Sequence, residues 1–461
     1  MCYRKLRVEV WSFVGMLALM LMAQPAQAEI EFGIPTPLPV PFDVGGGYGY
    51  PWLSADELDI YFTSDRAGPN SSDPYSEGAF DIWKSHRNST TDPWQTFVNL
   101  GAPINTSELT EAPGSFSADG EEFYFWRALS GFGLAEADLF VSRLQPDSSW
   151  GEPEPLSDLN TLEREANPAI SSDGLTLYFN TFVNPNYPSP SGLPWNMWVA
   201  KRSSREESFA NPEFFFDGYG IVTPDGLSHI FFGYPEFADF YGVPNVGDGD
   251  LYIRTRDSID VEFGAVQHLP APLNASGLDC CANISASGST LYFTSIRPGA
   301  DPGGTPLGFI DLWQAELAEA VSLDINPGDS DPINWLTKTV LSAAILSTSE
   351  VDAVNIDVTT LQFGDPLLIA DGALPVNPTS TTAVDVDGDG RIDLAMEFNI
   401  AEMRANGVIG LATEQGYITG EMLNGTVIVI AGRDPLAFVP EPSSLLLVFA
   451  GMLPLTIRRR A

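Results

Sequence analysis

The chain has 461 residues and a formal net charge of −39, from 61 acidic and 22 basic residues. Nucleic-acid binding needs a basic footprint, and anionic lipid headgroups repel an acidic surface, so this charge argues against both partners. A hydrophobic content of 44%, with 28 Phe, 14 Tyr and 10 Trp, excludes a disordered chain and supports one large core or two.

The N-terminus, residues 1–28, has the order of a secretory signal peptide. A basic start, an apolar run and a small-residue cleavage site follow one another: Arg4, Lys5 and Arg7; Trp11 to Ala23; Ala26-Gln27-Ala28. We expect cleavage between Ala28 and Glu29 and export through the inner membrane, with an uncleaved N-terminal anchor as the alternative. Without the signal peptide and the three basic residues at 458–460, the exported body holds 16 basic and 60 acidic residues, a charge near −44 that favours solubility and divalent cations.

After a Pro-rich linker at 29–42, one pattern recurs five times, with starts 52 to 63 residues apart. Each copy has a Ser/Thr-x-Asp-Gly or related turn and then an alternating aromatic strand. The turns begin at Ser54, Ser117, Ser171, Thr223 and Ser285. Second strands are expected at 81–83, 138–140, 196–198, 250–252 and 311–313, and third strands in some linkers. Repeats of this length predict a β-propeller over residues 43–319.

Two six-residue segments at the ends of the array are nearly identical: Tyr61-Phe-Thr-Ser-Asp-Arg66 and Tyr292-Phe-Thr-Ser-Ile-Arg297. These repeats resemble the TolB-type β-propeller repeat of periplasmic and surface proteins over about 275 residues. The resemblance implies five blades, or six if the chain ends assemble another. Such propellers mostly bind proteins or glycans and share no catalytic residue set.

Sialidase-like propellers have similar turns, but they also need an arginine cluster and a Tyr nucleophile. Here basic residues recur at strand ends, which indicates blade architecture: Arg66, Arg143, Arg202, Arg256 and Arg297. His86, His229 and His268 have no metal-ligand spacing, and no carboxylate pair stands out. We therefore predict a protein that is not an enzyme. The alternative is a secreted glycoside hydrolase or lyase that uses carboxylates in the propeller channel.

Cys280 and Cys281 are the only cysteines after the signal peptide, and they are adjacent. They cannot join distant strands to each other. A vicinal disulfide, two buried thiols and a link between chains all stay open, with a structural role favoured over redox chemistry.

Residues 320–436 predict a separate all-β domain, which resembles a small β-module at the C-terminus of bacterial surface proteins. It contains an acidic loop with carboxylates at positions 1, 3, 5 and 9 and Gly390 at position 6. The pattern matches a calcium loop with four side-chain ligands and one backbone carbonyl. These ligands are Asp385, Asp387, Asp389, Asp393 and the carbonyl of Arg391.

The loop departs from an EF-hand, because position 12 is Met396 and the flanks, 381–384 and 394–398, look like strands. It resembles the calcium-binding hairpins of FG-GAP and related extracellular repeats, which implies a structural calcium ion. The alternative is an acidic turn without a metal.

The tail, residues 437–461, combines an extended Pro440-Glu441-Pro442 motif, an apolar run from Leu445 to Ile457 and a basic stop at Arg458, Arg459 and Arg460. It resembles the PEP-CTERM sorting tail of Gram-negative surface proteins. This resemblance implies an exosortase-type processing enzyme as partner and a transient anchor in the inner membrane. A plain C-terminal anchor or a buried core segment are the alternatives.

The fold class predicted from these features is all-β. A five-bladed or six-bladed propeller precedes a small all-β domain, with a signal helix at the N-terminus and a membrane helix at the C-terminus. The expected protein is non-enzymatic, ends at the cell surface or in the extracellular matrix, and binds a protein or an exopolysaccharide through its propeller. A scaffold in an envelope complex is a further alternative.

Overall fold

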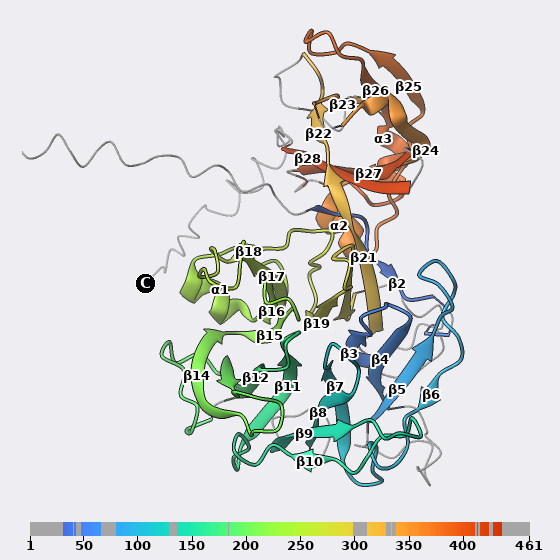
Figure 1. The fold of residues 1–461 in the computed structure, drawn as a ribbon. Helices are drawn as coiled ribbons and strands as arrows, with labels where there is room; N and C mark the ends of the chain where they lie inside the picture. The colour runs from blue at the N-terminus through green and yellow to red at the C-terminus, as the bar shows by residue number, and fades with distance from the viewer. Residues whose placement is uncertain are drawn as a thin grey trace, which may run out of the picture. The chain divides into compact units, whose positions relative to one another are not determined.

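The computed structural model describes residues 31–435 except 40, 43–47, 66–79, 129–135, 183, 298–310, 329–332, 334–337, 350, 411–412, 414 and 424–426. The described chain is nearly all-β, as predicted, with three short α-helices and one 3-10 helix among many strands. Figure 1 shows the strands as successive sheets, from β3 in blue to β21 in yellow.

The repeats form antiparallel sheets in which consecutive strands are neighbours. The first sheet holds β3 (Tyr48–Leu53), β4 (Asp59–Ser64), β5 (Asp81–His86) and β6 (Val98–Asn99). The second holds β7 (Thr110–Phe116), β8 (Glu122–Ala128), β9 (Ala137–Arg143) and β10 (Glu154–Pro155). The third holds β11 (Arg164–Ile170), β12 (Thr176–Phe182), β13 (Trp195–Lys201) and β14 (Ala210–Asp217), and a single parallel pair joins β11 to β9.

The fourth sheet holds β15 (Tyr219–Val222), β16 (Ser228–Gly233), β17 (Asp250–Thr255) and β18 (Gln267–His268), with α1 (Pro235–Tyr241) between β16 and β17. The fifth holds β19 (Asp279–Ile284), β20 (Thr290–Ser295) and β21 (Asp311–Ala320). The segment expected to be a linker adds β1 (Glu31–Phe32) and β2 (Thr36–Pro37), which both pair with β21. The start of the described chain therefore completes the last sheet of the array.

The first strand of each sheet contacts the first strands of the sheets before and after it. The contacts run from β3 to β7, β7 to β11, β11 to β15, β15 to β19 and β19 back to β3. A closed ring of inner strands is the arrangement of a β-propeller. We call β3, β7, β11, β15 and β19 the inner strands.

The predicted turns explain how each sheet folds locally. In the first copy, Ser54 Oγ donates to Asp56 Oδ1 at 2.6 Å, and the Leu58 N–H donates to the same oxygen at 3.1 Å. Three further copies repeat the hydroxyl–carboxylate bond: Ser117–Asp119, Ser171–Asp173 and Thr223–Asp225. These side chains replace backbone partners, so the chain reverses between the first two strands of a sheet without losing hydrogen bonds.

Some of the recurring arginines also have an architectural role, as predicted. The Arg202 Nε donates to the Gly174 carbonyl at 2.8 Å, and the Arg256 Nε donates to the Gly226 carbonyl at 2.6 Å. Arg87, in the first sheet, makes the same bond to the Glu57 carbonyl at 2.9 Å. Each guanidinium thus ties the end of the third strand to the turn of its own sheet. Arg66 lies outside the described residues.

The C-terminal part has its own hydrophobic core, which includes Leu341, Ile345, Phe363 and Phe398. Its elements are β22 (Ser322–Ile325), β23 (Val340–Leu346), η1 (Ala353–Asn355), β24 (Ile356–Gly364), α2 (Pro366–Ala370), β25 (Ser380–Val384), β26 (Asp393–Asn399), α3 (Ile400–Ala405), β27 (Gln415–Leu423) and β28 (Val427–Pro435). β21 runs to the predicted boundary and pairs in parallel with β28.

Candidate functional site

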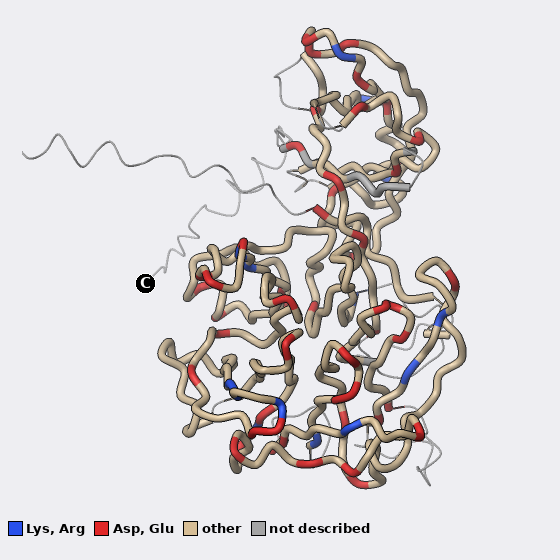
Figure 2. Tube along the Cα trace, viewed as in Figure 1, with Lys and Arg blue, Asp and Glu red and all other residues tan. Residues whose placement is uncertain are grey.

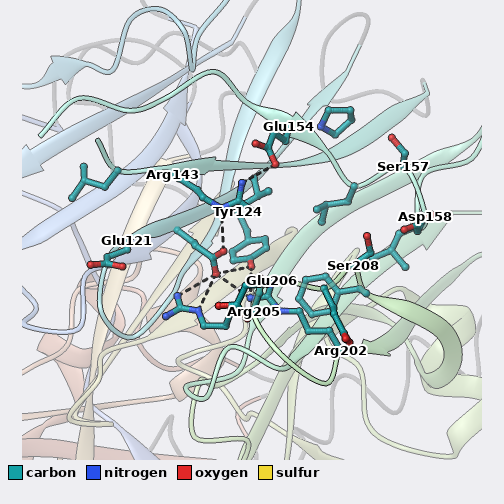
Figure 3. A pocket seen from close by; sticks show the side chains of 18 residues that line it. Glu121, Tyr124, Arg143, Glu154, Ser157, Asp158, Arg202, Arg205, Glu206 and Ser208 are labelled. Carbon is teal, nitrogen blue, oxygen red and sulfur yellow. Dashed lines mark hydrogen bonds and ion pairs between the residues drawn. The ribbon is translucent and has the colours of Figure 1, made fainter. Parts of the chain in front are cut away.

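A cleft of about 800 Å³ lies where the second and third sheets meet. Its floor holds Glu122, the first residue of β8, and Arg202, which follows β13. Figure 3 shows Arg202 together with Arg143, Arg205 and Glu154. We call this site the Glu122 cleft.

Three arginines from two sheets converge on the Glu122 carboxylate. Arg202 Nη2 lies 3.0 Å from Glu122 Oε2, Arg205 Nη2 lies 3.1 Å from the same oxygen, and Arg143 Nε lies 3.5 Å from Oε1. Arg205 also pairs with Asp119. Because Glu122 and Arg202 are 80 residues apart in the chain, the pairs that Arg202 and Arg205 make hold two neighbouring sheets together.

Neighbouring groups determine whether Glu122 and Tyr124 on the cleft floor are ionised. Burial acts to raise the pKa of Glu122, but Arg202, Tyr124 and Arg205 together outweigh burial and hold the pKa below its usual value. Tyr124 donates its hydroxyl hydrogen bond to Glu122 Oε2 at 3.0 Å. Burial and the neighbouring Glu122 carboxylate raise the pKa of Tyr124. Glu122 is therefore ionised at neutral pH, whereas Tyr124 is a neutral phenol and a poor nucleophile.

The wall of the cleft, in contrast, is open to solvent. Arg143 Nη1 and Glu154 Oε2 are 2.7 Å apart, and their side chains are 46% and 65% exposed. The lining also includes the acidic residues Glu121, Asp158, Glu206 and Glu207 and the hydroxyls of Ser157 and Ser208. The cleft therefore presents hydrogen-bond donors and acceptors side by side. They lie above a floor whose side chains are held in place by ion pairs.

Sequence reasoning missed this site. Arg143 and Arg202 were identified only as recurring strand-end residues, and nothing in the spacing of Glu122 and Arg202 brings them together. The recurrence of arginine after the third strand was the available signal. It places Arg202 near its own turn, but it does not show that the side chain also reaches the carboxylate of the preceding sheet.

The predicted metal loop lies on a hairpin between β25 and β26, where Val384 pairs with Asp393. Carboxylate oxygens of Asp385, Asp387 and Asp393 lie within 4.8 Å of one another. Asp393 is fully buried and accepts hydrogen bonds from the Ser347 and Val386 N–H groups at 2.8 and 2.7 Å. Three of the four predicted side-chain ligands are therefore brought together.

The fourth predicted ligand, Asp389, is not in this group. Its Oδ2 lies 2.7 Å from Arg391 Nη1, and its Oδ1 accepts the Arg391 N–H at 2.7 Å. Gly388 and Gly390 have φ of +80° and +89°, the left-handed conformation that the tight loop requires. The three converging carboxylates suit a hard divalent cation, since such ions prefer oxygen ligands.

Another set of acidic residues lies on the inner strands. Glu111, Glu165 and Asp279 are fully buried. Asp279 pairs with Arg297 at 2.7 Å, whereas Glu165 accepts from the Thr161 N–H, the Thr161 hydroxyl and Asn184. Burial raises the pKa of Glu165 to about 7 and that of Glu111 to about 8. Their recurrence at matching positions indicates an architectural role.

The histidines lie apart, as their spacing predicts. His86 contacts Asp59 at 2.8 Å, and His268 contacts Asp250 at 2.7 Å. His229 is fully buried, and its Nδ1 accepts from Arg254 Nε at 2.8 Å. Cys280 and Cys281 are free thiols on β19, with their sulfur atoms 3.0 Å apart.

The remaining predicted positions lie outside the described residues. These are the cleavage site Ala28 and Glu29, the motif Pro440, Glu441 and Pro442, the apolar run from Leu445, and Arg458, Arg459 and Arg460. Within the part of the chain that the structure describes, no helix is long and apolar enough to cross a membrane.

No family model matches the chain, and no curated protein matches it. Solved structures are similar to parts of it. TolB from Acinetobacter baumannii is 13% identical, with a TM-score of 0.32, and the match covers 75% of this chain and 65% of TolB. A family 117 glycoside hydrolase from Zobellia galactanivorans is 11% identical, with a TM-score of 0.41, over 62% of this chain and 90% of that one. An α-L-arabinofuranosidase from Lactobacillus brevis is 11% identical, with a TM-score of 0.37, over 59% and 90%.

These neighbours correct one prediction. We predicted that the protein is not an enzyme because its sequence contains no recognisable catalytic set. Glycoside hydrolases stand among the solved structures that the chain resembles, alongside TolB proteins. A propeller-like fold accommodates either role, so a lack of activity does not follow from this chain's sequence or fold.

Proposed function

We propose that this protein is an exported surface protein with a five-bladed propeller that binds a carbohydrate, such as an exopolysaccharide, in the Glu122 cleft. The observation that carries the proposal is the exposed Arg143–Glu154 pair above the buried Glu122–Arg202 pair. The closed ring of five inner strands supports the blade count.

A carbohydrate suits the cleft because each sugar hydroxyl both donates and accepts hydrogen bonds. Arginine forks donate and carboxylates accept, so the alternating lining can satisfy hydroxyls of either orientation. The acidic residues of the lining outnumber the three arginines, which disfavours a polyanion. The account therefore favours a neutral polysaccharide over an acidic one.

Export and sorting are part of the same proposal. The signal peptide at 1–28 would direct export, and the tail at 437–461 would hold the protein in the inner membrane until an exosortase-type enzyme processes it. Acidic residues outnumber basic ones in both the repeats and the C-terminal part (Figure 2), which suits a soluble protein displayed outside the cell.

We also propose that the acidic loop binds a structural calcium ion through Asp385, Asp387 and Asp393. Their convergence supports three carboxylate ligands, and the Arg391 carbonyl would add a fourth oxygen. Asp389 would act indirectly, because its pair with Arg391 fixes the loop. Affinity in the range of extracellular modules, roughly 10⁻⁴ to 10⁻³ M, is expected for such a site.

The test of the carbohydrate proposal is a screen of neutral and acidic polysaccharides with the purified full chain, which records binding and release of reducing ends together. The double variant Arg143→Ala and Glu154→Ala should lose at least tenfold in affinity. Lys201→Ala, an exposed basic residue outside the cleft, is the matched control. No carbohydrate binding, or equal binding by the double variant, would refute the proposal. Stable co-purification with one envelope protein instead would favour the scaffold alternative.

A further inference from the structure

A second cavity lies among the inner strands, and it shares no lining residue with the Glu122 cleft. Its volume is about 160 Å³. Four of the five inner strands contribute to its wall, with Tyr50 from β3, Arg164 from β11, Tyr219 from β15, and Cys280 and Cys281 from β19. Residues from four sheets thus meet at one place.

An outer apolar pocket of about 470 Å³ adjoins this inner cavity. The two spaces share Trp195, Phe232 and Tyr234 as walls. The rings of Phe232 and Tyr234 lie 5.5 Å apart in an edge-to-face arrangement, and Tyr234 is 36% exposed at the entrance. The same aromatic side chains therefore border both spaces.

We propose that this cavity binds a small monocarboxylate with a single aromatic ring. Arg164 is the one basic residue among the described residues that line the inner cavity, and no Asp or Glu lies in that lining. A guanidinium is the group that best matches a carboxylate, because its fork donates two parallel hydrogen bonds. The ring of the ligand would stack among Trp195, Phe232 and Tyr234.

Aromatic rings hold the Arg164 guanidinium in position. The Arg164 guanidinium lies 4.7 Å from the Trp126 ring centre and 6.0 Å from that of Trp195. The Tyr50 and Tyr219 hydroxyls lie beside it, and burial raises the pKa of both phenols, so they remain protonated at neutral pH. The inner end of the cavity thus combines one guanidinium with two neutral phenols.

Size and charge limit the ligand further. A cavity of about 150 Å³ is enough to hold a benzene ring, and the inner cavity has about 160 Å³. Glu236 is exposed at the lining of the outer pocket, where it repels a second negative charge. The ligand is therefore a monoanion whose outer end is neutral or positive.

Calorimetry on the full chain with phenylacetate and with its uncharged amide, phenylacetamide, tests the assignment. The acid should bind at least tenfold more tightly than the amide, and binding should slow alkylation of the partly exposed Cys281, which lines the cavity. Equal affinities, or no binding of either compound, would overturn the proposal. Preferential binding of galacturonate would overturn the aromatic class of the ligand.

Two variants locate the site. Arg164→Lys keeps the charge but loses the fork, and it should weaken phenylacetate at least fivefold. Since Arg164 is buried, Tyr234→Ala at the entrance is the variant less prone to unfold, with the same fivefold loss expected. Phe240→Ala, 56% exposed on α1 and outside both spaces, should leave affinity unchanged. Unchanged affinity in Tyr234→Ala would refute the site. Variants that lose phenylacetate binding should still bind carbohydrate in the Glu122 cleft. Each of the two proposals can therefore be refuted without the other.

Discussion

The Asn105 side chain takes the place of a neighbouring strand for Ile82 of β5. Its Oδ1 accepts the Ile82 N–H at 2.9 Å, and its Nδ2 donates to the Ile82 carbonyl at 2.9 Å. Asn160 makes the same two bonds to Leu139, and Asn274 makes them to Leu251. One side-chain amide thus closes the edge of the third strand in three sheets, where the fourth strand is short.

Replacing this amide should destabilise the propeller. Asn105→Ala leaves the buried Ile82 N–H unpaired, whereas the Ile82 carbonyl keeps its hydrogen bond from the Leu100 N–H at 3.1 Å, so the expected cost is about 1 to 3 kcal/mol in the free energy of unfolding. Chemical denaturation measures the change. Asn88→Ala, at an exposed position, is the control and should cost less than about 0.5 kcal/mol. Similar losses in both variants would show that the Asn105 bonds do not support the sheet edge.

Two substitutions in the Glu122 cleft should have different effects on protein stability and on carbohydrate binding. Glu122→Gln leaves Arg202 buried without its counter-charge, so we expect a loss of about 3 kcal/mol in unfolding free energy. Arg143→Ala removes a half-exposed partner and should cost less than about 1 kcal/mol while it weakens carbohydrate binding. Thermal unfolding and binding titrations on the two variants check both expectations. A large stability loss in Arg143→Ala would contradict this division of roles.

Stability should fall as pH rises from about 4.5 to 7, in part because of Glu165. Burial raises the folded-state pKa of Glu165 from the ordinary value of 4.5 to about 7. A raised pKa means that the folded state prefers the protonated acid, so its contribution is complete below pH 4.5 and is lost as pH rises through 7. Glu165→Gln should remove on the order of 2 kcal/mol of this pH dependence. Parallel pH profiles of the two proteins would show that Glu165 is not the titrating group.

Calcium should stabilise the C-terminal part through only some of the predicted ligands. At ten times the Kd, a bound ion adds about 1.4 kcal/mol to the free energy of unfolding. Asp385→Asn and Asp387→Asn should abolish the calcium-dependent rise in Tm, because both carboxylates converge with Asp393. Asp389→Asn should keep most of it, since Asp389 pairs with Arg391. Equal shifts with calcium and with chelator in the unmodified protein would mean that the loop binds no metal.

Much of each sheet could be predicted from local sequence. The Ser54–Asp56 turn and the aromatic strands after each turn depend on hydrogen bonds and alternation within about ten residues. The inner strands were harder, because β7 and β11 contain Pro, Gly or charged residues and lack alternation. They are buried on both faces and broken by register shifts, so the period-2 signal is absent.

Features that join distant residues could not be predicted in this way. The pairing of β2 with β21 connects Thr36 to Gln314, and the Glu122–Arg202 pair spans 80 residues. Both depend on how the sheets pack, which no local pattern encodes. The acidic loop could be predicted only in part. Its spacing predicted the convergence of Asp385, Asp387 and Asp393, but the pairing of Asp389 with Arg391 needed the structure.

The most direct test of carbohydrate binding is an experimental structure of the protein with the oligosaccharide that binds best in the polysaccharide screen. The account predicts sugar hydroxyls within hydrogen-bond distance of Arg143 and Glu154, over the Glu122–Arg202 floor. A sugar bound elsewhere on the propeller, with the cleft free of it at saturating concentration, would contradict the account.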